Sequence, residues 1–88
     1  TLATEFADKA KKAMHNKQWR EAARLMHQMR DQATLDPALS DLSYEILGFA
    51  YTEMGDYEEA LDYLGKAPIS PQIEAARKRC LEALGRSD

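Results

Sequence analysis

A pair of small residues 12 positions apart, Gly48 and Ala60, constrains the fold of this chain more than any other feature. The pair flanks a turn signal, Gly55-Asp56, so the two residues are expected on consecutive helices. Small side chains let two antiparallel helices approach closely, while larger neighbours fill the space around the contact. The spacing therefore predicts a helical hairpin in which Gly48 faces Ala60.

The same arrangement occurs earlier in the chain. Ala10 and Ala22 are also 12 positions apart, and the segment 18–22 is similar to the segment 56–60. At this offset Phe6 corresponds to Tyr44, and Met26 corresponds to Leu64. A recurring hairpin predicts an array of stacked helix pairs.

The first copy departs from the second at two positions. Lys9 and Ala13 stand where Leu47 and Tyr51 stand in the second copy. Terminal copies of a repeat are often atypical because one of their faces has no neighbour. The departure is consistent with a first copy at the end of a short array.

The second copy carries the pattern of a known repeat, W-x₂-L-G-x₂-Y followed by A-x₃-F and a proline. The matching residues are Tyr44, Leu47, Gly48, Tyr51, Ala60, Leu64 and Pro71, with Tyr for Trp and Leu for Phe. The chain therefore resembles a small member of the tetratricopeptide repeat (TPR) family. The resemblance implies an all-α, TPR-like right-handed superhelix of two antiparallel helix pairs plus a C-terminal capping helix. Residues 1–88 would form one domain, with units at about 3–36, 37–68 and 70–85.

Start and stop signals predict five helices. Asp36-Pro37 and Ser70-Pro71 each place an N-cap residue before a proline at the first helical position. Asp56 followed by Glu59 predicts a capping box for the fourth helix. The expected helices are about 4–16, 18–33, 37–54, a short one after 56, and a last one between 70 and 85. The third is apolar around much of its circumference, so we expect it at the centre.

The last helix differs from the other two first helices of a pair. Arg77 and Lys78 occupy the positions that Leu47 and Gly48 hold in the second copy. Two long cations oppose close packing of a following helix, so this helix is predicted to be the cap. Cys80 lies on its apolar stripe and is predicted to be a buried structural thiol.

Charge is unevenly distributed along the chain. The net charge is −3, but residues 1–30 carry +4, residues 31–65 carry −9 and residues 66–88 carry +2. Solvation of helix surfaces explains this pattern, and so does an acidic middle that attracts a basic partner or the basic end of another copy. No apolar run is long enough to span a bilayer, and one cysteine cannot form an internal disulfide. A cytoplasmic location is therefore expected.

The chain has no pattern that predicts chemistry. His15 and His27 lie on different predicted helices, without cysteines or carboxylates at metal-ligand spacing. No nucleophile motif or phosphate-binding glycine loop is present. We therefore expect no enzyme activity, no catalytic residues, no metal and no cofactor. Nucleic-acid binding is not expected either, because the pI is about 5.3 and aromatic residues are not interleaved with the basic ones.

The TPR resemblance implies a binding face. In that family the first helix of each pair lines a concave groove that holds a partner. Carried over by position, the groove residues are Lys11, Met14, His15, Leu42, Glu45, Phe49, Thr52, Glu53 and Arg79. Leu42 and Phe49 would suit an apolar or amphipathic ligand.

These features predict a non-enzymatic interaction module, an adaptor or chaperone that binds a helical or extended segment of another protein. By size and repeat number, the small TPR-like chaperones of type III secretion systems are one candidate subclass. The alternative is a structural or oligomerisation domain whose groove is filled by another copy, which the segregated charges favour.

Overall fold

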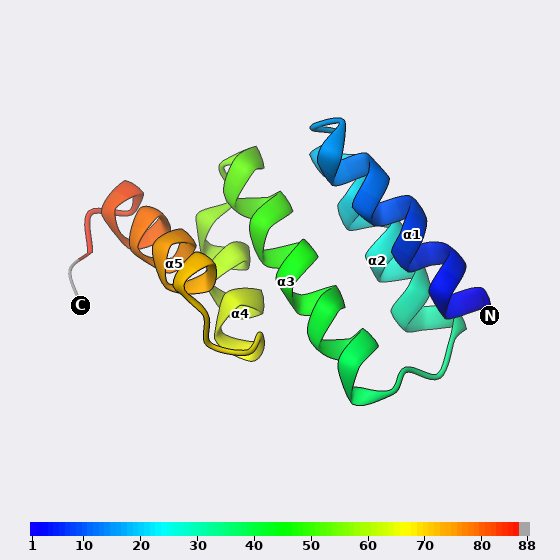
Figure 1. The fold of residues 1–88 in the computed structure, drawn as a ribbon. Helices are drawn as coiled ribbons and strands as arrows, with labels where there is room; N and C mark the ends of the chain where they lie inside the picture. The colour runs from blue at the N-terminus through cyan, green and yellow to red at the C-terminus, as the bar shows by residue number, and fades with distance from the viewer. Residues whose placement is uncertain (87–88) are drawn as a thin grey trace.

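The computed structural model describes residues 1–86, and within that range the chain forms five α-helices joined by short connections (Figure 1). The helices are α1 (Leu2–His15), α2 (Trp19–Gln32), α3 (Pro37–Met54), α4 (Tyr57–Lys66) and α5 (Pro71–Ala83). The all-α prediction is confirmed, with helix ends within about two residues of those expected.

Side chains and prolines start α3 and α5 as predicted. A carboxylate oxygen of Asp36 accepts a 2.8 Å hydrogen bond from the backbone N–H of Leu39. The hydroxyl of Ser70 accepts a 3.1 Å bond from the backbone N–H of Ile73. In both helices a proline follows the cap, where its missing N–H is of no consequence.

The capping box predicted for α4 is wrong. Asp56 has φ −89° and ψ 69°, outside the extended region of a side-chain cap, and its carboxylate caps no backbone N–H. The turn before it sets this conformation. Gly55 adopts the left-handed region with φ 83°, and the N–H of Asp56 bonds back to the carbonyl of Tyr51 at 2.9 Å.

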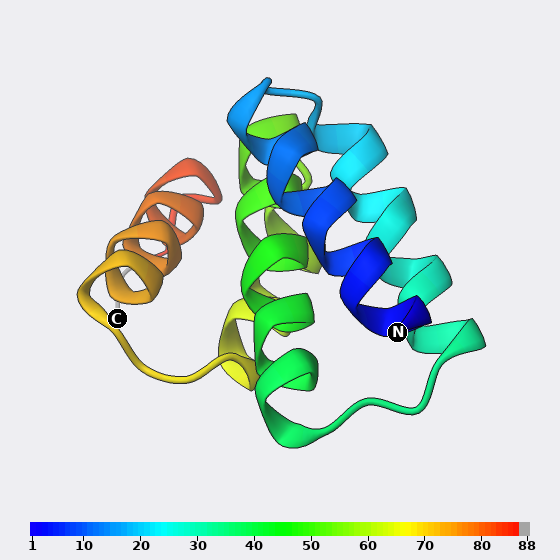
Figure 2. The same ribbon diagram turned by 45° about the vertical axis from the view of Figure 1, so that its right-hand side comes forward.

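Each helix packs against the next one in the chain, and α3 also packs against both α1 and α5. In Figure 1, α1, α3 and α5 lie side by side toward the viewer, with α2 and α4 behind them. In Figure 2, α4 stays behind α3, and α2 lies beside α1 at the right of the view. The predicted central position of α3 is confirmed, because it is the helix that contacts all four others.

The core consists of two clusters. The first joins α1, α2 and the adjoining side of α3, and the second joins α4 and α5 with the opposite side of α3. Their largest fully buried side chains include Met26, Met29, Leu47, Leu64 and Ile73. Tyr51 packs against both clusters and so links the two halves of the molecule.

Gly48 packs closely against α4 as predicted, but the residue opposite it is Leu64 rather than Ala60. A Cβ added to Gly48 would lie 2.5 Å from Cδ2 and 2.8 Å from Cγ of Leu64, so a larger residue has no room. The other members of the predicted small pairs, Ala10, Ala22 and Ala60, are fully buried. Glycine is thus required here by packing, since its φ is not in the left-handed region.

Helix α5 has the two-sided character expected of a cap. Cys80 is fully buried against α3, where its Sγ lies 3.3 Å from the hydroxyl of Thr52. Lys78 is exposed and Arg77 is half-buried. The prediction of a buried thiol at Cys80 is confirmed.

Candidate functional site

The face made by α1, α3 and α5, called here the front face, holds the residues predicted to bind a partner. On α1, Lys11 and His15 are exposed, whereas Met14 is half-buried and packs against the first core cluster. Lys11 and His15 are four residues apart and so share one side of the helix. They give the α1 edge of the front face a basic and polar character.

The middle of the front face is formed by α3. Leu42 is half-buried against the first cluster, and Phe49 is half-buried against the second. Glu45 lies between them in the chain and is also half-buried. The apolar side chains of α3 therefore present part of their surface to solvent while anchoring the neighbouring helices.

Thr52 does not belong to an open surface. Its side chain is 2% exposed, and its hydroxyl donates a 2.7 Å hydrogen bond to the carbonyl of Gly48. Helix α5 covers this position, with Cys80 beside the hydroxyl. The expectation that Thr52 contacts a partner is corrected: it is a packing residue between α3 and α5.

Two of the predicted residues bind each other. Nη1 of Arg79 on α5 donates a 2.6 Å hydrogen bond to Oε1 of Glu53 on α3. This bond raises the pKa of the Arg79 guanidinium. The Arg79 side chain is 58% exposed and that of Glu53 is 35% exposed, so solvent screens the ion pair and it contributes little to stability. The charges of Arg79 and Glu53 at the α3–α5 edge of the front face are therefore paired with each other.

The most connected polar side chain lies behind α3 and was not predicted. Arg30 on α2 donates hydrogen bonds of 2.7 Å to the hydroxyls of Ser43 and Tyr44 and one of 3.2 Å to that of Ser40. Its guanidinium carbon also lies 4.3 Å from the centre of the Tyr44 ring. Arg30 thus fastens α2 to α3.

Aromatic rings continue this contact. His27 Nε2 and the Tyr51 hydroxyl share a 2.9 Å hydrogen bond, and the rings of Tyr51 and Tyr63 stack with centres 5.5 Å apart. Burial raises the pKa of both tyrosines, and the nearby charge of Glu59 raises it further. The repeat pattern marked Tyr44 and Tyr51 as packing residues but gave no signal for their polar partners.

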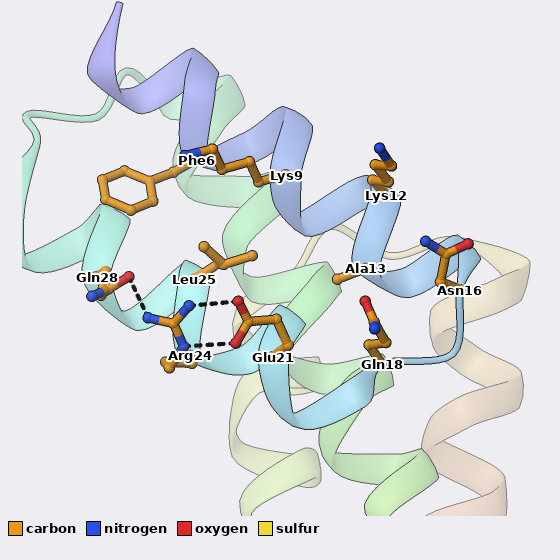
Figure 3. A pocket seen from close by; sticks show the side chains of 10 residues that line it. All are labelled: Phe6, Lys9, Lys12, Ala13, Asn16, Gln18, Glu21, Arg24, Leu25 and Gln28. Atoms are coloured by element: carbon orange, nitrogen blue, oxygen red, sulfur yellow. Dashed lines mark hydrogen bonds and ion pairs between the residues drawn. The ribbon is translucent and has the colours of Figure 1, made fainter.

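A hollow of about 350 Å³ lies between α1 and α2, on the side of this helix pair that faces away from α3 (Figure 3). We call it the outer groove. Its lining residues are Phe6, Lys9, Lys12, Ala13, Asn16, Gln18, Glu21, Arg24, Leu25 and Gln28. Arg24 is held in place by Glu21, whose Oε1 accepts a 2.7 Å bond from Nε, and by Gln28 at 3.0 Å. This ion pair lowers the pKa of Glu21 and raises that of Arg24.

Residues 1–86 offer neither a metal site nor a membrane span. They contain no group of three or more His, Cys, Asp or Glu side chains placed to hold a metal ion. None of their helices combines the length and apolarity needed to cross a bilayer.

Comparisons with protein-family models, with curated proteins and with solved structures find no match to this chain. Membership of the TPR family therefore stays a prediction that depends on the residues quoted above.

Proposed function

We propose that the chain is a non-enzymatic, TPR-like interaction module, an adaptor or chaperone that binds a helical or extended segment of another protein on its front face. The two helix pairs and α5 would form a short right-handed superhelix of that type, with the front face as its concave side. The small chaperones of type III secretion systems remain the candidate subclass, and cytoplasm the expected location.

The observation that carries the proposal is the arrangement of α1, α3 and α5. These three helices lie side by side while α2 and α4 occupy the other side (Figure 1). Leu42 and Phe49 lie on the central helix of the three and are only half-buried. Apolar side chains on a surface shared by three helices are a recognised mark of a partner site.

The charges around these side chains describe the partner. The α1 edge offers Lys11 and His15, and α3 offers Glu45 and, two turns further along, Glu53 in its ion pair with Arg79. A segment with apolar side chains in its middle and charges of both signs at its edges complements this surface. An amphipathic helix of that composition is the ligand we expect.

Site-specific photo-crosslinking tests the proposal. A photoreactive amino acid replaces Glu45 on the front face in one variant and the exposed Asp62 on α4 in a matched control, each expressed in the native host. We expect the Glu45 variant to yield one dominant adduct with another protein and the control to yield none. Equal adducts from both positions would contradict a binding site on the front face.

Self-association is the second candidate, because the acidic pair α3/α4 lies between the basic pair α1/α2 and the basic α5. If another copy fills the front face, the Glu45 adduct has the mass of a dimer. Light scattering at low and high salt gives an independent answer, since contacts between opposite charges weaken with salt. A chain that stays monomeric at low salt excludes this alternative.

A further inference from the structure

The outer groove has an internal counterpart. Adding 38 to the number of each lining residue gives the equivalent position in the second pair, and the equivalents of Phe6, Ala13 and Leu25 are Tyr44, Tyr51 and Tyr63. Those three tyrosines form the side of the second pair that faces α2. The chain thus presents the same kind of surface twice, once covered and once open.

The covered copy shows what such a surface holds. Helix α2 lies against it, with His27 within 6.1 Å of the Tyr51 ring and 6.0 Å of the Tyr63 ring, centre to centre. One turn further along α2, Arg30 binds Tyr44. The occupant of the second pair's surface is therefore a helix that contacts three aromatic side chains with residues three positions apart.

The first pair's surface differs from the second pair's at two positions, which make it less bulky and more positively charged. Ala13 replaces the bulk of Tyr51, and Lys9 replaces Leu47, which is fully buried in the second pair. What remains is an apolar floor of half-buried Phe6 and buried Leu25. Lys9 and Lys12 are exposed, and neither forms an ion pair with the residues described. Both lie on α1 at the edge of the hollow, with Lys12 directed away from α2 (Figure 3).

We propose that the outer groove binds an amphipathic helix of another protein, with an apolar stripe on the floor and carboxylates against Lys9 and Lys12. Such a helix would pack against α1 as α2 packs against α3, with a side chain reaching α2 as His27 reaches Tyr63 on α4. The acidic requirement comes from charge complementarity with the unpaired lysines.

A second copy of this chain does not fit the requirement. Among residues 1–86 the exposed large apolar side chains are Leu2, at the start of α1, and Ile69, between α4 and α5. Neither belongs to an apolar stripe on an acidic helix. The acidic helix α3 carries Leu42 and Phe49, but both side chains already pack against the core of their own copy. Helix α5 has Arg77 and Lys78 on the side left for a following helix, and these would repel the lysines of the outer groove.

Fluorescence anisotropy with a synthetic helix tests the site. The probe is a side-chain-stapled peptide of 14 residues, the length of α2, with leucines at every third or fourth position and glutamates on the flanks. We expect Lys9→Glu/Lys12→Glu to weaken its binding about tenfold or more, since two rim charges are reversed. The control Lys66→Glu/Lys78→Glu changes the net charge equally at exposed positions elsewhere and should keep the parent affinity.

Three further measurements separate apolar docking in the outer groove from nonspecific attraction between charges and from binding on the front face. A peptide with the same glutamates but no apolar stripe should bind at least about tenfold more weakly, and a single-stranded oligonucleotide should not compete. Phe49→Ala, on the front face, should leave the affinity for the stapled peptide unchanged, so this site can fail while the proposed function holds. Equal binding of both peptides, competition by the oligonucleotide, or no effect of Lys9→Glu/Lys12→Glu would overturn the proposal. So would light scattering that shows a dimer abolished by the same variant.

Discussion

The two helix pairs of this protein share one design and fill it differently. In α3/α4 the close contact is between Gly48 and Leu64, whereas in α1/α2 the same positions are Ala10 and Met26. Leu64 leaves no room for a Cβ at Gly48, whereas Ala10 and Met26 are both fully buried at the equivalent positions of the first pair. The comparison teaches that the same pair of positions can hold glycine with leucine or alanine with methionine.

The pairs differ more in what covers them. The surface of α3/α4 that contains Leu47 and Tyr51 is covered by α2, and the equivalent surface of α1/α2 contains Lys9 and Ala13 and is open. The residue types at these positions therefore depend on whether another helix covers the surface, and not on the contacts within the pair. Each prediction below tests one part of this comparison.

Truncation at equivalent positions should give the largest contrast. Leu47 is fully buried, so we expect Leu47→Ala to lower the free energy of unfolding by about 2–5 kcal/mol. Lys9→Ala, its equivalent on α1, should leave stability essentially unchanged because Lys9 is exposed. Urea unfolding followed by circular dichroism measures both. Similar losses from the two variants would mean that the α1 surface is covered as well, for example in a dimer.

Converting one contact into the other is a sharper test. We expect Gly48→Ala to destabilise the protein by about 1–3 kcal/mol, because the new methyl group overlaps Leu64 even though alanine is the better helix former. Gly48→Ala/Leu64→Met recreates the Ala10–Met26 pair and should recover most of this loss. A double-mutant cycle from urea unfolding gives the coupling energy. A coupling energy of zero would show that the two pairs are not equivalent.

Replacing Arg30 tests whether hydrogen bonds stabilise the boundary between the two pairs, where α2 contacts α3. Arg30→Met keeps the length of the side chain but removes its hydrogen bonds to Ser43 and Tyr44, so we expect a loss of about 1–2 kcal/mol. The control Arg24→Met alters an exposed arginine of the same helix and should have little effect. If the two variants unfold at the same urea concentration, the boundary is held by its apolar contacts alone.

The architecture was largely predictable because it depends on properties that a sequence displays directly. Helix ends followed Asp36-Pro37 and Ser70-Pro71, and the burial of Cys80 followed its place on an apolar stripe. The Gly48–Ala60 spacing identified the helix pair and the position that has no room for a side chain, although the residue opposite Gly48 is Leu64 rather than Ala60.

The candidate site was less predictable, since exposure depends on the crossing angle of neighbouring helices. Thr52 has the helical position of a groove residue, but α5 covers it. The partners of Arg30 lie 10 to 14 positions away on another helix, and the periodicity of the sequence does not predict such hydrogen bonds. Asp56 does not cap α4 with its side chain, because the turn at Gly55 holds its backbone outside the extended conformation that such a cap needs.

The smallest predicted effect is a loss of stability at alkaline pH, caused by two tyrosines at the boundary between the pairs. Burial raises the pKa of Tyr51 and Tyr63 above the ordinary value of 10.0, and the equivalent residues of the first pair, Ala13 and Leu25, do not titrate. A folded-state pKa above the unfolded one means that the folded protein holds its phenolic protons longer. The resulting stabilisation is complete below about pH 10 and is lost as the pH rises through the folded-state pKa. We therefore expect Tyr51→Phe/Tyr63→Phe to flatten the fall of the urea midpoint above about pH 10, and Tyr51→Phe alone to flatten it partly. An unchanged alkaline slope in the double variant would mean that these phenols titrate as they do in the unfolded chain, and that α2 does not seal the surface of the second pair.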